Sequence, residues 1–228
     1  SGSFFGATGL EASSHRAMKF NGDITNLDTQ GLTGANYTDA ISILNNKDEY
    51  VFNVISAPGL IYDFATHKAP IDSIISLAET RGDCIAVIDV EQYGATVSNA
   101  TAAANTINSS YAATYWPWLQ TQSESGRNVF TDGAAAPWFA PAGLTRGGIG
   151  NVIQAERKLT RTQRDTLYTN NINPIATFPG SGISVFGQKT LQKKKSALDR
   201  VNVRRLLISL KKFVGDVSKT LIFEQNTI

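Results

Sequence analysis

The sequence of 228 residues predicts an α/β fold, in which a small, mostly parallel sheet with flanking helices is followed by a long C-terminal amphipathic helix. Two runs, residues 50–55 and 84–90, are rich in β-branched and apolar side chains, as buried strands are. The run between them, residues 70–80, places four apolar side chains on one helical face, Ile71, Ile74, Ile75 and Ala78. This order of strand, helix and strand predicts a parallel βαβ unit buried on both faces.

Local signals predict where the elements of this unit begin and end. Residues 36–45 form a further helix, because Tyr37, Ala40, Ile41 and Leu44 share a face. The first strand should stop at residues 57–59, Ala-Pro-Gly. The helix over 70–80 should start at Pro70, which suits a first turn, and end at Arg81-Gly82.

A second crossover follows the strand over residues 84–90. The Ala-rich residues 96–109 predict a helix, and residues 111–119 predict a third strand that ends in Trp-Pro-Trp. Residues 50–119 are therefore expected to form a small doubly wound α/β layer.

The next part of the chain is less periodic. Residues 137–143 hold too many prolines for a helix and too many aromatics for a solvated loop, so we expect an ordered apolar turn. Residues 159–169 predict a short helix, for which Thr160 and Gln163 form a capping box.

The last element is the long amphipathic run over residues 196–221. Ser196 and Asp199 have the spacing of a capping box at its start. A helix of about 25 residues rises roughly 37 Å, so this one is either the spine of the core or a beam that carries contacts beyond it. Its apolar residues lie mostly three or four apart, at Leu198, Val201, Leu206, Leu210, Phe213, Val214, Val217 and Leu221.

Composition limits the class of protein. Hydrophobic residues make up 42% and charged residues 18%, which is typical of globular domains. No run of 18 apolar residues predicts a membrane span, and the N-terminus lacks a signal-peptide pattern. The single Cys84 excludes an intrachain disulfide and a multi-cysteine metal site. We interpret residues 1–35 as an irregular segment at the edge of a removed or inserted domain, and residues 36–228 as one α/β domain.

Charge is distributed unevenly along the chain, although the net charge is only +2. Residues 1–145 hold 6 Lys/Arg against 14 Asp/Glu, whereas residues 188–219 hold 10 against 2. This asymmetry favours either an acidic partner for the basic end or head-to-tail contacts between copies. The alternative is that Lys and Arg only solvate the outer face of the long helix.

Signals for catalysis and for nucleotide or nucleic-acid binding are weak. His15 and His67 lack metal-ligand spacing, and Cys84 opens an apolar strand, where thiols are usually unreactive. Asp89 lies at a strand's C-terminal end, where it either serves an active site or caps the following turn. The glycine-rich residues 143–150 and 180–182 lack the strand–loop–helix context of a phosphate loop. Basic residues near the C-terminus could contact phosphates, but no aromatics alternate with them to stack on bases.

Seven short strings nevertheless follow one another in a familiar order. They are Pro137 to Gly143 with Arg146-Gly147, Asn151-Val152-Ile153, Gln163-Arg164-Asp165 with Leu167-Tyr168, Ile172-Asn173-Pro174-Ile175, Gly187-Gln188-Lys189-Thr190, Arg200-Val201-Asn202-Val203-Arg204-Arg205-Leu206, and Phe223-Glu224-Gln225-Asn226. In this order and spacing the set resembles the core of contractile tail sheath proteins of myovirus-type bacteriophages and of related contractile injection systems.

This resemblance implies a structural protein that is not an enzyme and needs no cofactor or metal. Such subunits form homo-oligomers, stacked six-fold rings in a helical sheath around a tail tube, and they also meet baseplate and tail terminator proteins. Contraction drives the tube through the host envelope. The implied location is the virion, after assembly in the host cytoplasm, with no membrane insertion and no nucleic-acid binding. Residues 36–228 would then be the sheath core domain.

From charge placement we expect five basic residues to contact another subunit or the tube, Arg200, Arg204, Arg205, Lys211 and Lys212. Two departures from the family matter. First, sheath subunits begin with an extended arm and continue beyond the Phe-Glu-x-Asn string, so the chain resembles a fragment without the strand-exchanging ends. Second, the segment over residues 118–137 is shorter than in the family. The alternatives are a doubly wound α/β enzyme with a site at the strand ends near Asp89, and a nucleic-acid-binding module on the basic helix.

Overall fold

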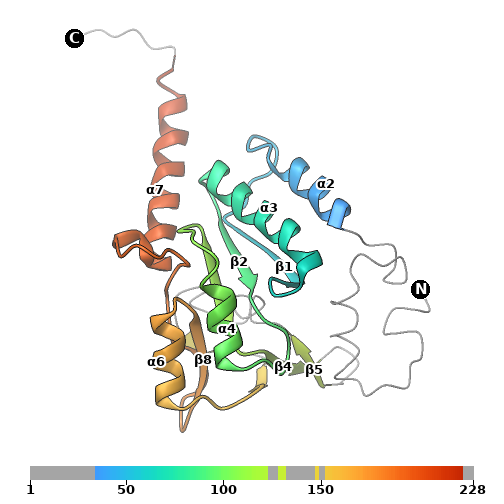
Figure 1. Cartoon of the computed structure of the whole chain (residues 1–228). Coiled ribbons are helices and arrows are strands. Elements are labelled where there is room, and N and C mark those ends of the chain that lie inside the picture. The colour runs from blue at the N-terminus through green and yellow to red at the C-terminus, as the bar shows by residue number, and fades with distance from the viewer. Residues whose placement is uncertain (1–33, 123–127, 132–146, 149–151, 223–228) are drawn as a thin grey trace.

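The computed structural model describes residues 34–122, 128–131, 147–148 and 152–222 (Figure 1). Its main sheet has six strands in the order β1-β2-β3-β8-β9-β6. The first four of these are parallel, and the last two run antiparallel to their neighbours. Their bounds are β1 Val54–Ile61, β2 Ile85–Asp89, β3 Ala112–Trp116, β8 Asn173–Phe178, β9 Gly182–Val185 and β6 Gly147–Gly148. The prediction of a mostly parallel sheet with flanking helices is confirmed.

Three helices cover one face of this sheet: α3 Ala65–Arg81, α4 Val97–Ala104 and α6 Arg161–Thr169. Their apolar side chains share one core cluster, which includes Ile74 of α3, Ala100 of α4 and Leu167 of α6. The sheet is therefore not doubly wound, because consecutive right-handed crossovers that proceed in one direction leave their helices on the same face.

A small antiparallel sheet, in the order β5-β4-β7, was not predicted. Its Leu119 and Ala155 pack in a second core cluster with Val87 of β2, Tyr115 of β3 and Val201. Both faces of the main sheet are therefore buried, as a near-continuous apolar strand such as β2 requires. The strands are β4 Leu119–Gln122, β5 Asn128–Thr131 and β7 Val152–Ala155.

Several element bounds differ from the expected ones. Strand β1 continues through Pro58 and Gly59 with an irregular register, which an edge strand tolerates because its outer side needs no ladder hydrogen bonds. Helix α3 begins five residues before Pro70 but ends as expected, where Gly82 adopts φ 67° and donates to Ala78 O.

The second crossover also differs from the expectation. Helix α4 ends at Ala104, where Lys193 Nζ donates to Ala104 O (3.1 Å) and to Asn105 Oδ1 (2.9 Å). The expected strand over residues 111–119 is divided at a cis Trp116–Pro117 bond, after which the chain enters the second sheet.

Helices α2, Gly34–Leu44, and α6 follow the predicted pattern more closely, whereas the start of α7, Val201–Lys219, differs from it. Helix α2 packs on α3, and α6 has the expected capping box between Thr160 and Gln163. The box expected between Ser196 and Asp199 is wrong: Ser196 Oγ accepts from Leu198 N in a short 3-10 turn, Ala197–Asp199. The long helix α7 starts only after Arg200.

Some predicted features lie outside the described residues. They include His15 and most of the segment over residues 1–35, the apolar turn over 137–143, most of the glycine-rich residues 143–150, and the string Phe223-Glu224-Gln225-Asn226. Within the described part of the chain, no helix is both long and apolar enough to cross a bilayer.

A cationic cluster at the base of helix α7

Asn173 organises the region that holds the predicted basic residues. Its side chain is fully buried on β8. The amide Nδ2 donates to Thr114 O (3.1 Å) and Lys189 O (2.8 Å), and Oδ1 accepts from Lys189 N (2.6 Å). A Cβ at Gly187 would lie 2.9 Å from Asn173 Oδ1, so only glycine fits at this point. These contacts fix the backbone of Lys189 against the sheet.

The same segment pairs with the start of α7. Lys189 and Arg200 form an antiparallel bridge, flanked by bonds from Thr190 N to Asp199 O (3.0 Å) and from Val201 N to Gln188 O (2.8 Å). Paired residues of an antiparallel bridge project to the same side. The chain therefore brings two cationic side chains together although they are separated by ten residues of sequence.

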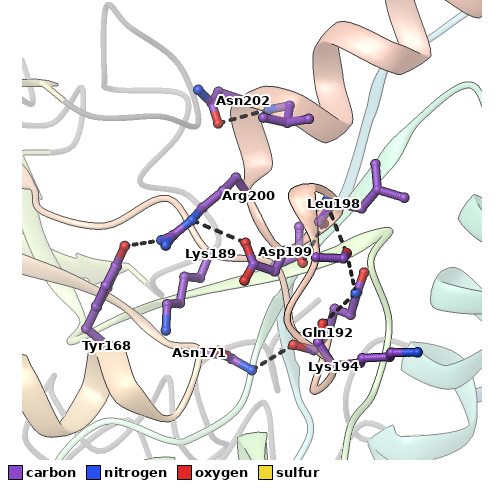
Figure 2. Close-up of polar contacts among 12 residues, drawn as sticks. Tyr168, Asn171, Lys189, Gln192, Lys194, Leu198, Asp199, Arg200 and Asn202 are labelled. Carbon is purple, nitrogen blue, oxygen red and sulfur yellow. Dashed lines mark hydrogen bonds and ion pairs between the residues drawn. The ribbon is translucent and has the colours of Figure 1, made fainter.

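Both cations converge on Tyr168 of α6, as Figure 2 shows. Lys189 Nζ lies 4.4 Å from the centre of the Tyr168 ring, and Arg200 Nη1 donates to the Tyr168 hydroxyl. Arg200 Nε also pairs with Asp199 Oδ1 at 3.2 Å. Partial burial and the nearby Arg200 lower the pKa of Lys189, against the opposing effect of Asp199. Positive charge thus exceeds negative charge at this point.

Along α7 the predicted contact residues have different surroundings. Arg204 is buried: its Nε donates to Ser110 O (3.1 Å), its Nη2 donates to Ser110 Oγ, and its guanidinium lies 4.0 Å from the centre of the Tyr111 ring. Arg205 is half-buried, whereas Lys211 and Lys212 are exposed. Arg204 therefore fastens α7 to its own domain, whereas Arg205, Lys211 and Lys212 remain at the rim or on the outside.

Helix α7 buries only Val201, Arg204 and Ile208. The far end of α7 extends beyond the sheets (Figure 1), as the beam alternative requires. The helix and the turn after it expose a stripe of large apolar side chains, each between 48% and 66% exposed: Leu206, Leu210, Phe213, Val214, Val217 and Leu221. We call this set the α7 stripe. Exposed apolar patches of this extent mark interaction surfaces.

The strand ends that the enzyme alternative requires are occupied by buried polar groups. Asp89 is buried at the end of β2, and its carbonyl accepts from Tyr62 N (2.9 Å). His67 is buried as well, and its Nδ1 accepts from Ile61 N (3.0 Å), which is a structural use of an imidazole. Burial, reinforced by Asp83, raises the pKa of the Cys84 thiol to about 11, so it is protonated at neutral pH. The described residues contain no group of three His, Cys, Asp or Glu side chains placed to hold a metal.

Glu91 carries a further buried charge that sequence reasoning did not single out. Its side chain is buried, and burial, with a smaller contribution from Asp63, raises its pKa from 4.5 to about 7. The Glu91 carbonyl accepts from Trp118 Nε1 (3.0 Å), which places the residue where the two sheets meet. No sequence pattern marks such a residue, because its contact with Trp118 joins positions 27 residues apart.

Replacing Glu91 by glutamine should stabilise the fold above neutral pH. Below about pH 4.5 the Glu91 carboxyl is protonated in both the folded and the unfolded state. As the pH rises above 4.5, the carboxyl ionises in the unfolded state but stays protonated in the folded state, so the stability of the wild type falls until the pH passes the folded-state pKa near 7. The difference between variant and wild type should grow to about 1–3 kcal/mol at pH 8. Urea unfolding at several pH values measures this difference in stability, and the exposed Glu49→Gln serves as the control. A difference that does not change with pH would contradict the raised pKa of Glu91.

Comparison with known proteins now identifies the family. The phage tail sheath protein central domain matches residues 30–191, and the chain belongs to this family. It is 43% identical over 102 residues to the tail sheath protein of Vibrio phage KVP40, covering 45% of this chain and 15% of that protein. It is also 43% identical over 110 residues to the tail sheath protein of Enterobacteria phage T4, covering 48% and 17%. The chain thus spans only 15% to 17% of the length of these two relatives.

Solved structures share the fold at low sequence identity. A chain of the anti-feeding prophage baseplate superposes with a TM-score of 0.64 at 16% identity, over 99% of this chain and 63% of that one. The sheath tail protein of Desulfitobacterium hafniense gives a TM-score of 0.62 at 15% identity, over 87% and 45%. These likenesses confirm the architecture that the resemblance implied.

Proposed function

We propose that this chain forms part of a structural subunit of a contractile tail sheath. The observation that carries the proposal is the match of the sheath central domain over residues 30–191. The subunit would polymerise as stacked six-fold rings around an inner tail tube and contract to drive the tube through the host envelope. Its other partners would be the baseplate and tail terminator proteins. It would reside in the virion after assembly in the host cytoplasm, and it would act without catalysis.

Two surface features support an assembly role. The α7 stripe exposes apolar area that a lone domain would bury, and we propose that it packs against other sheath polypeptide. At the start of α7 and along it we retain four basic residues as contacts to a neighbouring subunit or the tube, Arg200, Arg205, Lys211 and Lys212. Arg204 is left out because its side chain is buried within the domain, whereas the other four are at least partly exposed. Residues 36–228 would be the sheath core domain, and residues 1–35 the edge of another domain.

Charge reversal on α7 tests this proposal. In the full-length protein, the combined change Arg205→Glu, Lys211→Glu and Lys212→Glu should abolish sheath polymers, because it would place six units of altered charge against an acidic neighbour. Negative-stain microscopy measures the outcome. The matched control reverses three exposed cations elsewhere, Lys68→Glu, Lys158→Glu and Arg161→Glu, and should assemble normally.

Normal sheaths from the α7 variant would remove these residues from the contact set. Failure of the unmodified full-length protein to form any tubes or rings would instead overturn the proposed function. Circular dichroism of the same preparations shows whether loss of assembly reflects loss of folding.

A further inference from the structure

A small hollow lies beside the cationic cluster, between helix α6 and the chain that leaves β9. Its volume is about 280 Å³. Ligand pockets for cofactor-sized molecules usually range from about 300 to 1,000 Å³, so this hollow suits one or two residues of a peptide. Its lining consists of Arg164, Asp165, Tyr168, Pro174, Val185, Phe186, Gly187 and Gln188.

Cations and aromatic rings alternate around this hollow. The Arg164 guanidinium lies 5.1 Å from the centre of the Phe178 ring and 5.9 Å from that of Phe186. It donates one hydrogen bond, from Nη1 to Leu159 O (3.0 Å), which leaves most of its five donors unused by the described residues. On the other side, Tyr168 holds Lys189 and Arg200 against its ring and hydroxyl.

The apolar part of the hollow is equally defined. Phe186 is 56% exposed, yet the centre of its ring lies 5.1 Å from that of the Phe178 ring, so it offers an apolar surface that packs on Phe178. Pro174 and Val185 continue the apolar floor. A ring so exposed beside a guanidinium with free donors favours a ligand that combines a carboxylate with a hydrocarbon side chain.

We propose that this hollow binds an extended acidic peptide segment of another polypeptide. A carboxylate of the segment would bind Arg164, with Lys189 and Arg200 adding positive potential at Tyr168. An adjoining apolar side chain of the segment would cover Phe186. Asp165, at the rim, would disfavour a second anionic group and so favours a peptide over a polyphosphate backbone. This binding site shares only Arg200 with the contact residues of the proposed function.

Fluorescence anisotropy of labelled peptides on the whole chain tests the proposal. The probes are the N-terminally labelled, C-terminally amidated tetrapeptide Phe-Ser-Glu-Leu, which carries one carboxylate, and its uncharged analogue Phe-Ser-Gln-Leu. At low salt the charged peptide should bind at least about tenfold more tightly, because its carboxylate gains charge-assisted bonds. Arg164→Gln and Phe186→Ser should each weaken it about fivefold or more, whereas the remote Lys68→Gln should not. Circular dichroism of each variant shows whether it is folded.

Three results would overturn the proposal. Equal affinity for the two peptides, including no binding of either, would show that no carboxylate is recognised. Unchanged affinity in both Arg164→Gln and Phe186→Ser would place binding elsewhere. Stronger binding of a labelled single-stranded oligonucleotide, lost in Arg164→Gln, would make the ligand a nucleic acid. Because sheath formation is measured separately by microscopy, failure here leaves the proposed function unaffected.

Discussion

Replacing Asn173 by alanine should lower the free energy of unfolding by about 3–5 kcal/mol. The change deletes three hydrogen bonds at a fully buried position and leaves Thr114 O, Lys189 O and Lys189 N without their partner. A buried backbone group that loses its partner costs about 1–3 kcal/mol. Urea unfolding followed by tryptophan fluorescence measures the change.

The exposed Asn45→Ala at the end of α2 is the matched control and should alter stability by less than about 0.5 kcal/mol. Asn173→Asp keeps an acceptor for Lys189 N but turns an oxygen toward two carbonyls, so it should not restore stability. A loss below about 1 kcal/mol in Asn173→Ala would show that water replaces the amide. It would also remove this residue as the anchor of the cationic cluster.

Replacing Arg81 by methionine should lower the free energy of unfolding by about 3–5 kcal/mol. The Arg81 side chain is fully buried and forms two bonds to Asp83, Nε to Oδ1 (2.9 Å) and Nη2 to Oδ2 (2.8 Å). It also donates to Tyr50 O (2.7 Å) and to Leu44 O, and it lies 4.2 Å from the centre of the Phe52 ring. Removing one partner of a buried charged network is among the costliest single changes.

This change should also have a local signature, because Arg81 joins the end of α3 to the end of α2. Amide hydrogen exchange of α2 should accelerate more than that of β2 or β3, which lie beyond the lost contacts. The control is Arg161→Met, whose side chain is 89% exposed and 4.0 Å from Asp165, and which should cost less than about 0.5 kcal/mol. Uniform acceleration of exchange throughout the domain would contradict the local role.

Elements defined by short-range patterns were predicted well. The strand over residues 84–90 and the helix before it follow from apolar runs and periodicity, and α6 follows from Thr160 and Gln163, which interact within one turn. Strands β8 and β9 were missed, because seven of residues 171–190 are turn-forming Asn, Pro or Gly. Their strand state depends on the pairing of β8 with β3 and of β9 with β8.

For the basic residues, too, the sequence predicts less than the tertiary structure shows. Their positions on a helix were predictable, but the sequence gives equal weight to Arg204 and Arg205, which differ by one residue. Only the fold places Ser110 and Tyr111 under Arg204, so one arginine is buried and its neighbour lies at the rim. The cluster of Lys189, Arg200 and Tyr168 was likewise invisible, because three separate segments supply it.

The sequence by itself determined the α/β class, the order of the first βαβ unit, the amphipathic character of α7 and the resemblance to sheath proteins. All of these depend on residue types and on spacings within one element. The tertiary structure decided which face of α7 is free, which cations fasten the domain and which remain for partners, and that all crossover helices share one side of the sheet. These depend on contacts between segments up to 94 residues apart, such as Arg204 with Ser110, whose geometry no local pattern encodes.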